Sequence, residues 1–236
     1  MTRNLSLIFI VLWSSAFITT KIIVENSTPF ASLTLRFILV ALGFLLFSIY
    51  IKDQVFVKLK HIFEAFLSGV LFHGLYLGGV FYSIYIGLPA SVSALIVSMH
   101  PILTNIFAGP ILKEKVTWKQ WIGVVLGFVG AALVLGFDIG STLPAVGISA
   151  AFVALIAITS STLWQKKLSN NLPLSVSNMY QAIGGCLFHL IIILLFIDPY
   201  INFTKTFIIA MSHQIILVSF GAFTILMYLI KNNSAS

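Results

Sequence analysis

The chain has 236 residues, of which 59% are hydrophobic and only 8% are charged. Soluble domains carry roughly 25% charged residues, so this composition excludes the water-soluble classes of protein. The formal net charge of +7 does not indicate a nucleic-acid-binding protein, because the basic residues form short clusters between long apolar segments, a pattern typical of membrane topology.

Eight apolar segments are long enough to cross a bilayer as helices, since about 20 apolar residues span the hydrocarbon core. In chain order they are 5–24, 33–51, 62–86, 89–112, 118–137, 145–166, 174–197 and 207–230. Polar, proline-containing turns separate several of them, for example at 26–29 and 170–173. The segments are continuously apolar and do not alternate as barrel strands do, so we expect an all-α, polytopic membrane helix bundle.

The basic residues predict the orientation of this bundle. One predicted side holds Arg3, Lys52, Lys58, Lys60, Lys113, Lys115, Lys119, Lys166, Lys167 and Lys231, and the other holds only Lys21, Arg36 and Lys205. Because the positively charged side of a membrane protein faces the cytoplasm, we expect both ends of this chain to be cytoplasmic. The membrane we expect is the bacterial cytoplasmic membrane.

A weak internal repeat relates the two parts of the chain. Asn26 and Pro29 recur 144 residues later as Asn170 and Pro173, and after one insertion the third predicted helix falls on the eighth. The offset covers five helices, an odd number, so the two parts should have opposite orientations in the membrane. Inverted repeats of this kind are typical of transporters.

The repeat also predicts the domain boundaries. Residues 1–137 form a first five-helix repeat, and residues 138–236 form a second repeat with only three helices. The second repeat has no counterparts of the fourth and fifth helices. We therefore expect the chain to be cut after the eighth helix of a ten-helix design, and a genuine eight-helix protein is the alternative.

Several short motifs follow one another in a specific order. They are Trp13-Ser14-Ser15-Ala16-Phe17, Leu35-Arg36-Phe37, Pro89-Ala90-Ser91 followed by Pro101, and Ile111-Leu112-Lys113-Glu114-Lys115-Val116-Thr117-Trp118-Lys119-Gln120-Trp121-Ile122-Gly123 followed by Gly127 and Gly130. In this order and spacing the sequence resembles the EamA-type branch of the drug/metabolite transporter superfamily over nearly its whole length. The resemblance implies two inverted five-helix halves around a cavity lined by helices 1, 3, 4, 6, 8 and 9. It also implies an acidic residue at the end of helix 4, and Glu114 fits that position.

Polar and aromatic residues inside the predicted helices are the candidates for the cavity wall. Unrolled at 100° per residue, the third helix places Gly69, His73, Tyr76 and Ser83 within one arc of about 80°. The fourth helix carries a similar stripe. The substrate-cavity candidates are Trp13, His73, Tyr76, Ser93, His100, Thr104 and Trp164. For the histidines the alternative is a buried side chain bonded to a neighbouring helix, and for the tryptophans it is an interface anchor.

Three further residues are expected to have gating or structural roles. Pro101 should kink the fourth helix, which either shapes a binding site or is a plain proline kink. Glu114 lies near the cytoplasmic edge. Arg36, like Lys21, lies near the outer end of its helix and either snorkels to the interface or attracts anionic substrates.

Two sets of residues favour helix packing over function. Asn178, Gln181, Gly185 and His189 share one face of the seventh predicted helix and are expected to form interhelical hydrogen bonds. Gly123, Gly127 and Ala131 are expected to form a packing seam in the fifth.

The function that fits these features is transport of small organic solutes, such as amino acids, metabolites or amphipathic drugs, by alternating access. The alternative is a truncated, non-transporting protein or assembly subunit of the same fold. An enzyme is not expected, since 66–69 lacks the first glycine of Gly-x-Ser-Gly and the sequence has neither a His-Glu-x-x-His site nor a phosphate-binding glycine loop.

The expected partners are a small-molecule substrate and membrane lipid, with a coupling proton carried by His73 or His100 as an open option. We expect no cofactor, no metal and no nucleic acid. Nothing in the sequence selects one oligomeric state.

Overall fold

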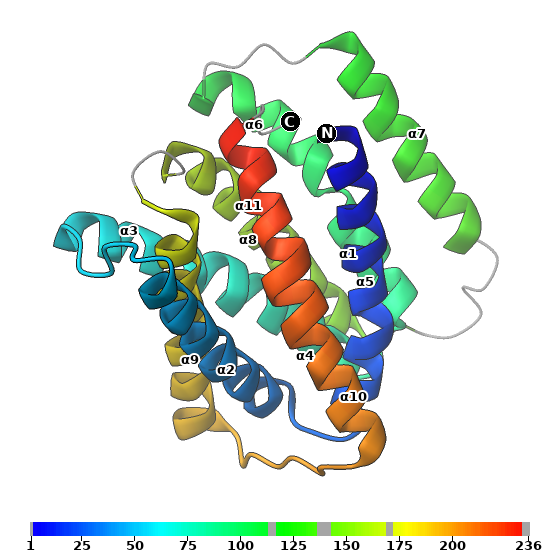
Figure 1. The fold of residues 1–236 in the computed structure, drawn as a ribbon. Coiled ribbons are helices and arrows are strands. Elements are labelled where there is room, and N and C mark those ends of the chain that lie inside the picture. Colours follow the sequence, from blue (N-terminus) through cyan, green and yellow to red (C-terminus); the bar gives the residue numbers. More distant parts are fainter. Residues whose placement is uncertain (1, 113–116, 136–142, 169–171, 233–236) are drawn as a thin grey trace.

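The structure of the chain, a computed structural model, describes residues 2–112, 117–135, 143–168 and 172–232, and these are almost entirely helical (Figure 1). In chain order the elements are α1 (Thr2–Val24), α2 (Pro29–Tyr50), α3 (Leu59–Gly69), η1 (Val70–Tyr76), α4 (Leu77–Tyr85), α5 (Ala90–Ser98), α6 (His100–Leu112), α7 (Trp118–Leu135), α8 (Ala145–Leu168), α9 (Leu174–Phe196), α10 (Lys205–His213), η2 (Gln214–Ala222) and α11 (Phe223–Asn232).

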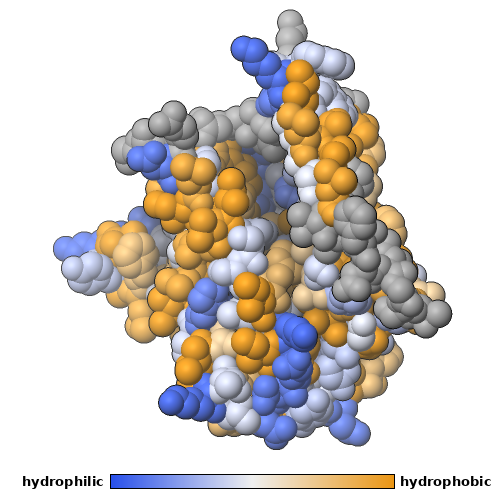
Figure 2. Space-filling view, turned by 90° about the vertical axis from the view of Figure 1, so that its right-hand side faces the viewer, coloured by the Kyte–Doolittle hydropathy of each residue, from blue (hydrophilic) through white to orange (hydrophobic). Residues whose placement is uncertain are grey.

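Within the described residues, each of the eight predicted segments contains helix. Seven continuous helices of the described part are long and apolar enough to cross a membrane. The remaining segment, the fifth in chain order, contains α7, an apolar helix of 18 residues that packs against α5 and α6. Large apolar side chains such as Leu194 (73% exposed) and Phe196 (74% exposed) face outward. Figure 2 shows another face of the molecule, where apolar residues also cover much of the surface and hydrophilic residues lie mainly toward the ends. The predicted all-α helix bundle is confirmed.

Prolines define several of the helix starts. Pro29 occupies the first turn of α2, and Pro89 and Pro173 immediately precede α5 and α9. A proline fits these positions because it fixes φ and the first turn does not use its missing N–H group. The helix is interrupted at Met99, two residues before Pro101, since α5 ends at Ser98 and α6 begins at His100.

Two of the long helices contain a π-helical segment. η1 joins α3 to α4, and η2 joins α10 to α11, so each of these two spans is interrupted near its middle. Val70 and Gln214, the first residues of the two segments, are 144 positions apart, which is the offset of the predicted sequence repeat. π-helical turns often occur at functional sites because they change the direction in which side chains point.

The backbones of α3 and α9 are in direct contact. A Cβ atom at Gly69 would overlap the backbone carbonyl of Gln181, and one at Gly184 would overlap the carbonyl of Phe66. Such close approach needs glycine, as small-residue interfaces in membranes do. The contact fixes the position of η1, which follows α3 directly.

One end of the bundle is closed by two connecting segments that lie side by side. The backbone N–H of Asn202 donates to the carbonyl oxygen of Asn26 at 2.8 Å, and the N–H of Thr28 donates to that of Tyr200 at 3.1 Å. An isolated antiparallel bridge joins Ser27 and Ile201. α1 begins and α11 ends at the other end of the bundle (Figure 1).

The predicted packing seam of the fifth helix is not found. A Cβ atom added at Gly123 or Gly127 would meet no atom of the described part within 4 Å. Both glycines are exposed. The seam prediction was wrong because glycine spacing alone does not indicate which face of a helix has a neighbour.

Candidate functional site

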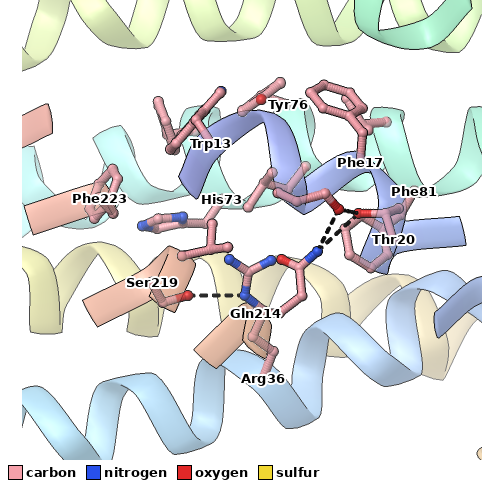
Figure 3. A pocket seen from close by; sticks show the side chains of 15 residues that line it. Trp13, Phe17, Thr20, Arg36, His73, Tyr76, Phe81, Gln214, Ser219 and Phe223 are labelled. Carbon is pink, nitrogen blue, oxygen red and sulfur yellow. Dashed lines mark hydrogen bonds between the residues drawn. The ribbon is translucent and has the colours of Figure 1, made fainter. Parts of the chain in front are cut away.

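A narrow cavity lies between α1, η1, α4, η2 and α11, with Arg36 of α2 at one side (Figure 3). Its aromatic walls are Trp13, Phe17, Phe72, Tyr76, Phe81 and Phe223, and its polar groups are Thr20, Arg36, His73, Gln214 and Ser219. The centres of water molecules can occupy only about 30 Å³ of this space, which is room for about two waters. The cavity is therefore narrow in this conformation and must widen to admit an organic solute.

The aromatic wall is continuous across three helices. The ring of Trp13 stacks on Tyr76 with centroids 6.5 Å apart and an interplanar angle of 12°, and it meets the edge of Phe72 at 5.9 Å. Phe72 in turn contacts Phe223 at 5.0 Å. A flat or apolar solute entering here would replace these ring contacts with its own.

Arg36 is buried, with 3% of its surface exposed. Its Nε donates to the Ser219 hydroxyl at 3.0 Å, and its guanidinium carbon lies 5.4 Å from the ring centroid of Phe37. It lies seven residues after Pro29, which is about 10 Å along the helix axis. The snorkelling interpretation of Arg36 was wrong, because the guanidinium turns into the bundle toward Ser219. Lys21 is exposed, as that interpretation expects of it.

The ring of His73 projects from η1 into the aromatic cluster. Its centroid lies 4.6 Å from those of Phe37 and Phe223, and Nδ1 has no hydrogen-bond partner among the described residues. The backbone carbonyl of His73 accepts a hydrogen bond from His189 Nε2 of α9 at 2.9 Å. The interhelical hydrogen bond of His73 thus uses its backbone carbonyl, and its imidazole ring stays at the cavity.

Gln214 and Ser219 are cavity residues that the sequence analysis missed. The amide nitrogen of Gln214 donates to the carbonyl oxygen of Ala16 at 2.9 Å and to the hydroxyls of Thr19 and Thr20 at 2.9 and 3.1 Å. The segment containing Gln214 reads as one apolar run. The internal repeat could have predicted these cavity residues, since it aligns this segment with the span that carries His73 and Tyr76.

Of the seven cavity candidates, Trp13, His73 and Tyr76 line the central cavity and the others do not. Ser93 shares a hydrogen bond with Ser83 at 3.0 Å, which joins α4 to α5. Trp164 lines a separate cleft of about 390 Å³ between α6 and α8.

His100 and Thr104 belong to the kinked fourth span and are also absent from the lining of the central cavity. Thr104 is 1% exposed, and its hydroxyl has no partner in the described part of the chain. Glu114 lies outside the described residues.

The predicted hydrogen-bonding role of the α9 residues is confirmed for Gln181 and His189. Gln181 Oε1 accepts from Gln165 of α8 at 2.9 Å and from Ser68 of α3 at 3.4 Å. Three helices are thereby joined next to the contact between α3 and α9.

A wide groove borders the central cavity. It has about 760 Å³ of space between α1 and α5, and Trp13 and Phe17 line both the groove and the central cavity. These two side chains therefore separate the two spaces. In the described part of the chain no group of three or more His, Cys, Asp or Glu side chains is placed to hold a metal ion.

A solved crystal structure of another protein has the same fold, with a TM-score of 0.80 over 99% of this chain and 80% of the other, at 16% identity. Among sequence relatives, "Uncharacterized transporter YvbV" of Bacillus subtilis is 26% identical over 53% of this chain and 42% of its own length. An "Uncharacterized transporter" of Archaeoglobus fulgidus is 25% identical over 73% of this chain and 60% of its own length. The chain thus spans less than two thirds of either relative.

The EamA-like transporter family matches residues 4–136, which is more than half of the chain. This match agrees with the motifs that begin at Trp13 and with the apolar, multi-span helical architecture. Proteins of the family and the named relatives are transporters and not enzymes. The chain is a multi-pass integral membrane protein and belongs to the EamA-like transporter family.

Proposed function

We propose that this chain transports small organic solutes by alternating access, with the cavity between α1, η1 and η2 as the solute site. One observation carries the proposal: the cavity combines an aromatic wall with a few polar groups and lies where both π-helical segments interrupt their spans. A binding site needs such a mixture, because apolar walls supply affinity and sparse polar groups supply orientation.

The narrowness of the cavity supports a conformational step. With room for about two waters, it is closed to an organic solute in the present arrangement. Transporters of inverted-repeat design expose a central site to one side at a time. The two π-helical segments are the places where the spans containing Tyr76 and Ser219 can bend.

The membrane we propose is the bacterial cytoplasmic membrane, with the lysine-rich end of the bundle inside. His73 is the histidine that lines the cavity among the described residues, and in this proposal it would carry a coupling proton. A pH gradient imposed across the vesicles in the assay below tests this coupling.

The test is solute exchange in proteoliposomes with a matched pair of variants. Val218 is 4% exposed and lines the cavity, whereas its neighbour Leu217 is 43% exposed on the outer face of the same segment. Val218→Trp should obstruct the cavity and lower exchange of labelled amino acids, carboxylates and cationic dyes at least about ten-fold. Leu217→Trp should exchange at the rate of the unmodified chain.

The outcome that rejects the proposal is also specific. If Val218→Trp inserts normally and exchanges solute as fast as Leu217→Trp, the solute does not pass through this cavity. If the unmodified chain moves no member of the panel in either direction, transport by this chain alone is wrong.

A further inference from the structure

Among the described residues, Arg36 is a buried positive charge without a buried negative partner. The four acidic residues of the described part are Glu25, Asp53, Glu64 and Asp198, and each lies in a connecting segment or near the start of a helix. The ion pairs in that part of the chain join Glu64 to Lys60 and His61, and none includes Arg36. A buried charge normally has a counter-charge, because its desolvation is otherwise uncompensated.

The guanidinium has spare hydrogen-bonding capacity at the cavity. Nε is engaged by the Ser219 hydroxyl at 3.0 Å, but Nη1 is buried and has no hydrogen-bond partner among the described residues. The Ser219 oxygen accepts this bond, so its own O–H remains able to donate. Arg36 and Ser219 together therefore present donors to the cavity, and donors of this kind bind anions (Figure 3).

The remaining wall selects an organic anion over an inorganic one. Trp13 and Tyr76 lie across the cavity from the guanidinium (Figure 3), and Phe72 and Phe223 also line the cavity. A small inorganic anion would leave these rings unmatched, whereas a carboxylate attached to an apolar or aromatic body contacts both sides of the cavity.

We propose that the central cavity recognises a small organic acid, whose carboxylate binds Arg36 and whose apolar body packs on the aromatic wall. This inference rests on the proposed function and narrows its substrate class. In this proposal Arg36 binds the anion and Ser219 orients the guanidinium. The bound carboxylate then supplies the counter-charge for Arg36.

The test measures binding to the purified chain in detergent, so it does not depend on transport. Phenylacetate and phenylacetamide have the same shape and differ in charge. By calorimetry, phenylacetate should bind roughly ten-fold or more tightly than phenylacetamide, because a charge-assisted hydrogen bond to a buried guanidinium is among the stronger polar contacts. Equal dissociation constants for the two compounds would overturn the proposal without any variant.

Variants then assign the preference to Arg36. Arg36→Gln should abolish the difference between the two compounds, and Arg36→Lys should keep part of it because the charge remains without the planar fork. Lys205→Gln removes an exposed positive charge from the same end of the bundle and should keep the full difference. A preference that survives in Arg36→Gln would overturn the assignment.

Two further arms separate the possible failures. In the first arm, chloride is compared with phenylacetate. If chloride raises the thermal midpoint as much as phenylacetate does and also abolishes phenylacetate binding, the cavity is an inorganic-anion site and the organic-acid proposal is overturned. In the second arm, the exchange of cationic dyes is compared with the binding of phenylacetate. If Val218→Trp blocks dye exchange while phenylacetate binds no more tightly than phenylacetamide, the result supports the proposed function and rejects this inference.

Discussion

Trp13, together with Phe17, separates the closed cavity from the open groove between α1 and α5. Replacing it with alanine should join the two spaces. In a Cys186→Ser background, a cysteine at Val218 should react several-fold faster with a small thiol reagent when Trp13→Ala is added. The rate of modification, followed by mass spectrometry, checks this.

The control for that experiment is another tryptophan on a different helix. Trp118 is 77% exposed on α7 and does not line the central cavity. Trp118→Ala should leave the reactivity of the cysteine at position 218 unchanged. Equal acceleration by both alanine variants would mean that the cavity opens through general loosening of the bundle and not through Trp13.

His189 is predicted to stabilise the fold through the backbone of η1. Its Nε2–H donates to the carbonyl oxygen of His73 at 2.9 Å, and both residues are buried. His189→Phe removes the donor and leaves that carbonyl without this bond, so the free energy of unfolding should fall by about 1–2 kcal/mol. Reversible unfolding in mixed micelles measures it.

The matched control is His61→Phe, since His61 is partly exposed beside Glu64. This change should alter stability by less than about 0.5 kcal/mol. If the two phenylalanine variants are equally stable, the bond between α9 and η1 contributes nothing measurable.

At the level of single residues, the sequence predicted Trp13, His73 and Tyr76 at the cavity. It did not predict the direction of Arg36. A long charged side chain near a helix end turns outward or inward according to what lies beside it, and here the deciding partner is Ser219, 183 positions away. Such pairing depends on tertiary packing and cannot be read from one helix.

At the level of elements, the contact between α3 and α9 should be sensitive to single methyl groups. Gly184→Ala places a Cβ against the carbonyl of Phe66, whose backbone cannot move without shifting α3. Overpacking of this kind costs roughly 1–3 kcal/mol. The thermal midpoint in detergent should fall for Gly184→Ala and stay unchanged for Gly127→Ala, where an added Cβ meets no described atom.

A tolerated Gly184→Ala, with no change in the thermal midpoint, would contradict the close approach of these two helices. A fall of equal size in Gly127→Ala would contradict the assignment of the effect to α3 and α9.

The π-helical segment η1 explains why the sequence analysis placed Ser83 of the third span on the wrong face. A helical wheel at 100° per residue puts Ser83 on the same face as His73 and Tyr76. In the structure η1 intervenes, and its wider turn rotates everything after Tyr76 relative to that wheel. Ser83 consequently bonds Ser93 of α5 and does not line the cavity. Regular helix geometry could not predict this, because the sequence carries no simple signal for a π turn.

At the level of the whole molecule, seven of the eight predicted spans, and their order, were predictable because each apolar segment must satisfy its own backbone hydrogen bonds in lipid. The pairing of distant helices was not, since it depends on contacts such as those of Gly69 with Gln181. The inverted repeat stays a prediction. The matching positions of Val70 and Gln214 at the start of the two π-helical segments agree with it.

The orientation of the bundle gives the last prediction. The segments around residues 26 and 202 meet at one end, and the chain enters α1 and leaves α11 at the other. Lys58 and Lys205 are both exposed and lie at opposite predicted sides. In a Cys186→Ser background, Lys205→Cys should react with an impermeant maleimide in intact cells, because the lysine-poor end is predicted to face outward.

Lys58→Cys should react only after the cells are permeabilised, because the ten basic residues on its side predict that this side is cytoplasmic. The opposite pattern would invert the molecule and place the Arg36 end of the cavity inside. Labelling of both positions in intact cells would mean that an odd number of the spans between residues 58 and 205 does not cross as predicted. The two cysteines therefore test the orientation and the span count together.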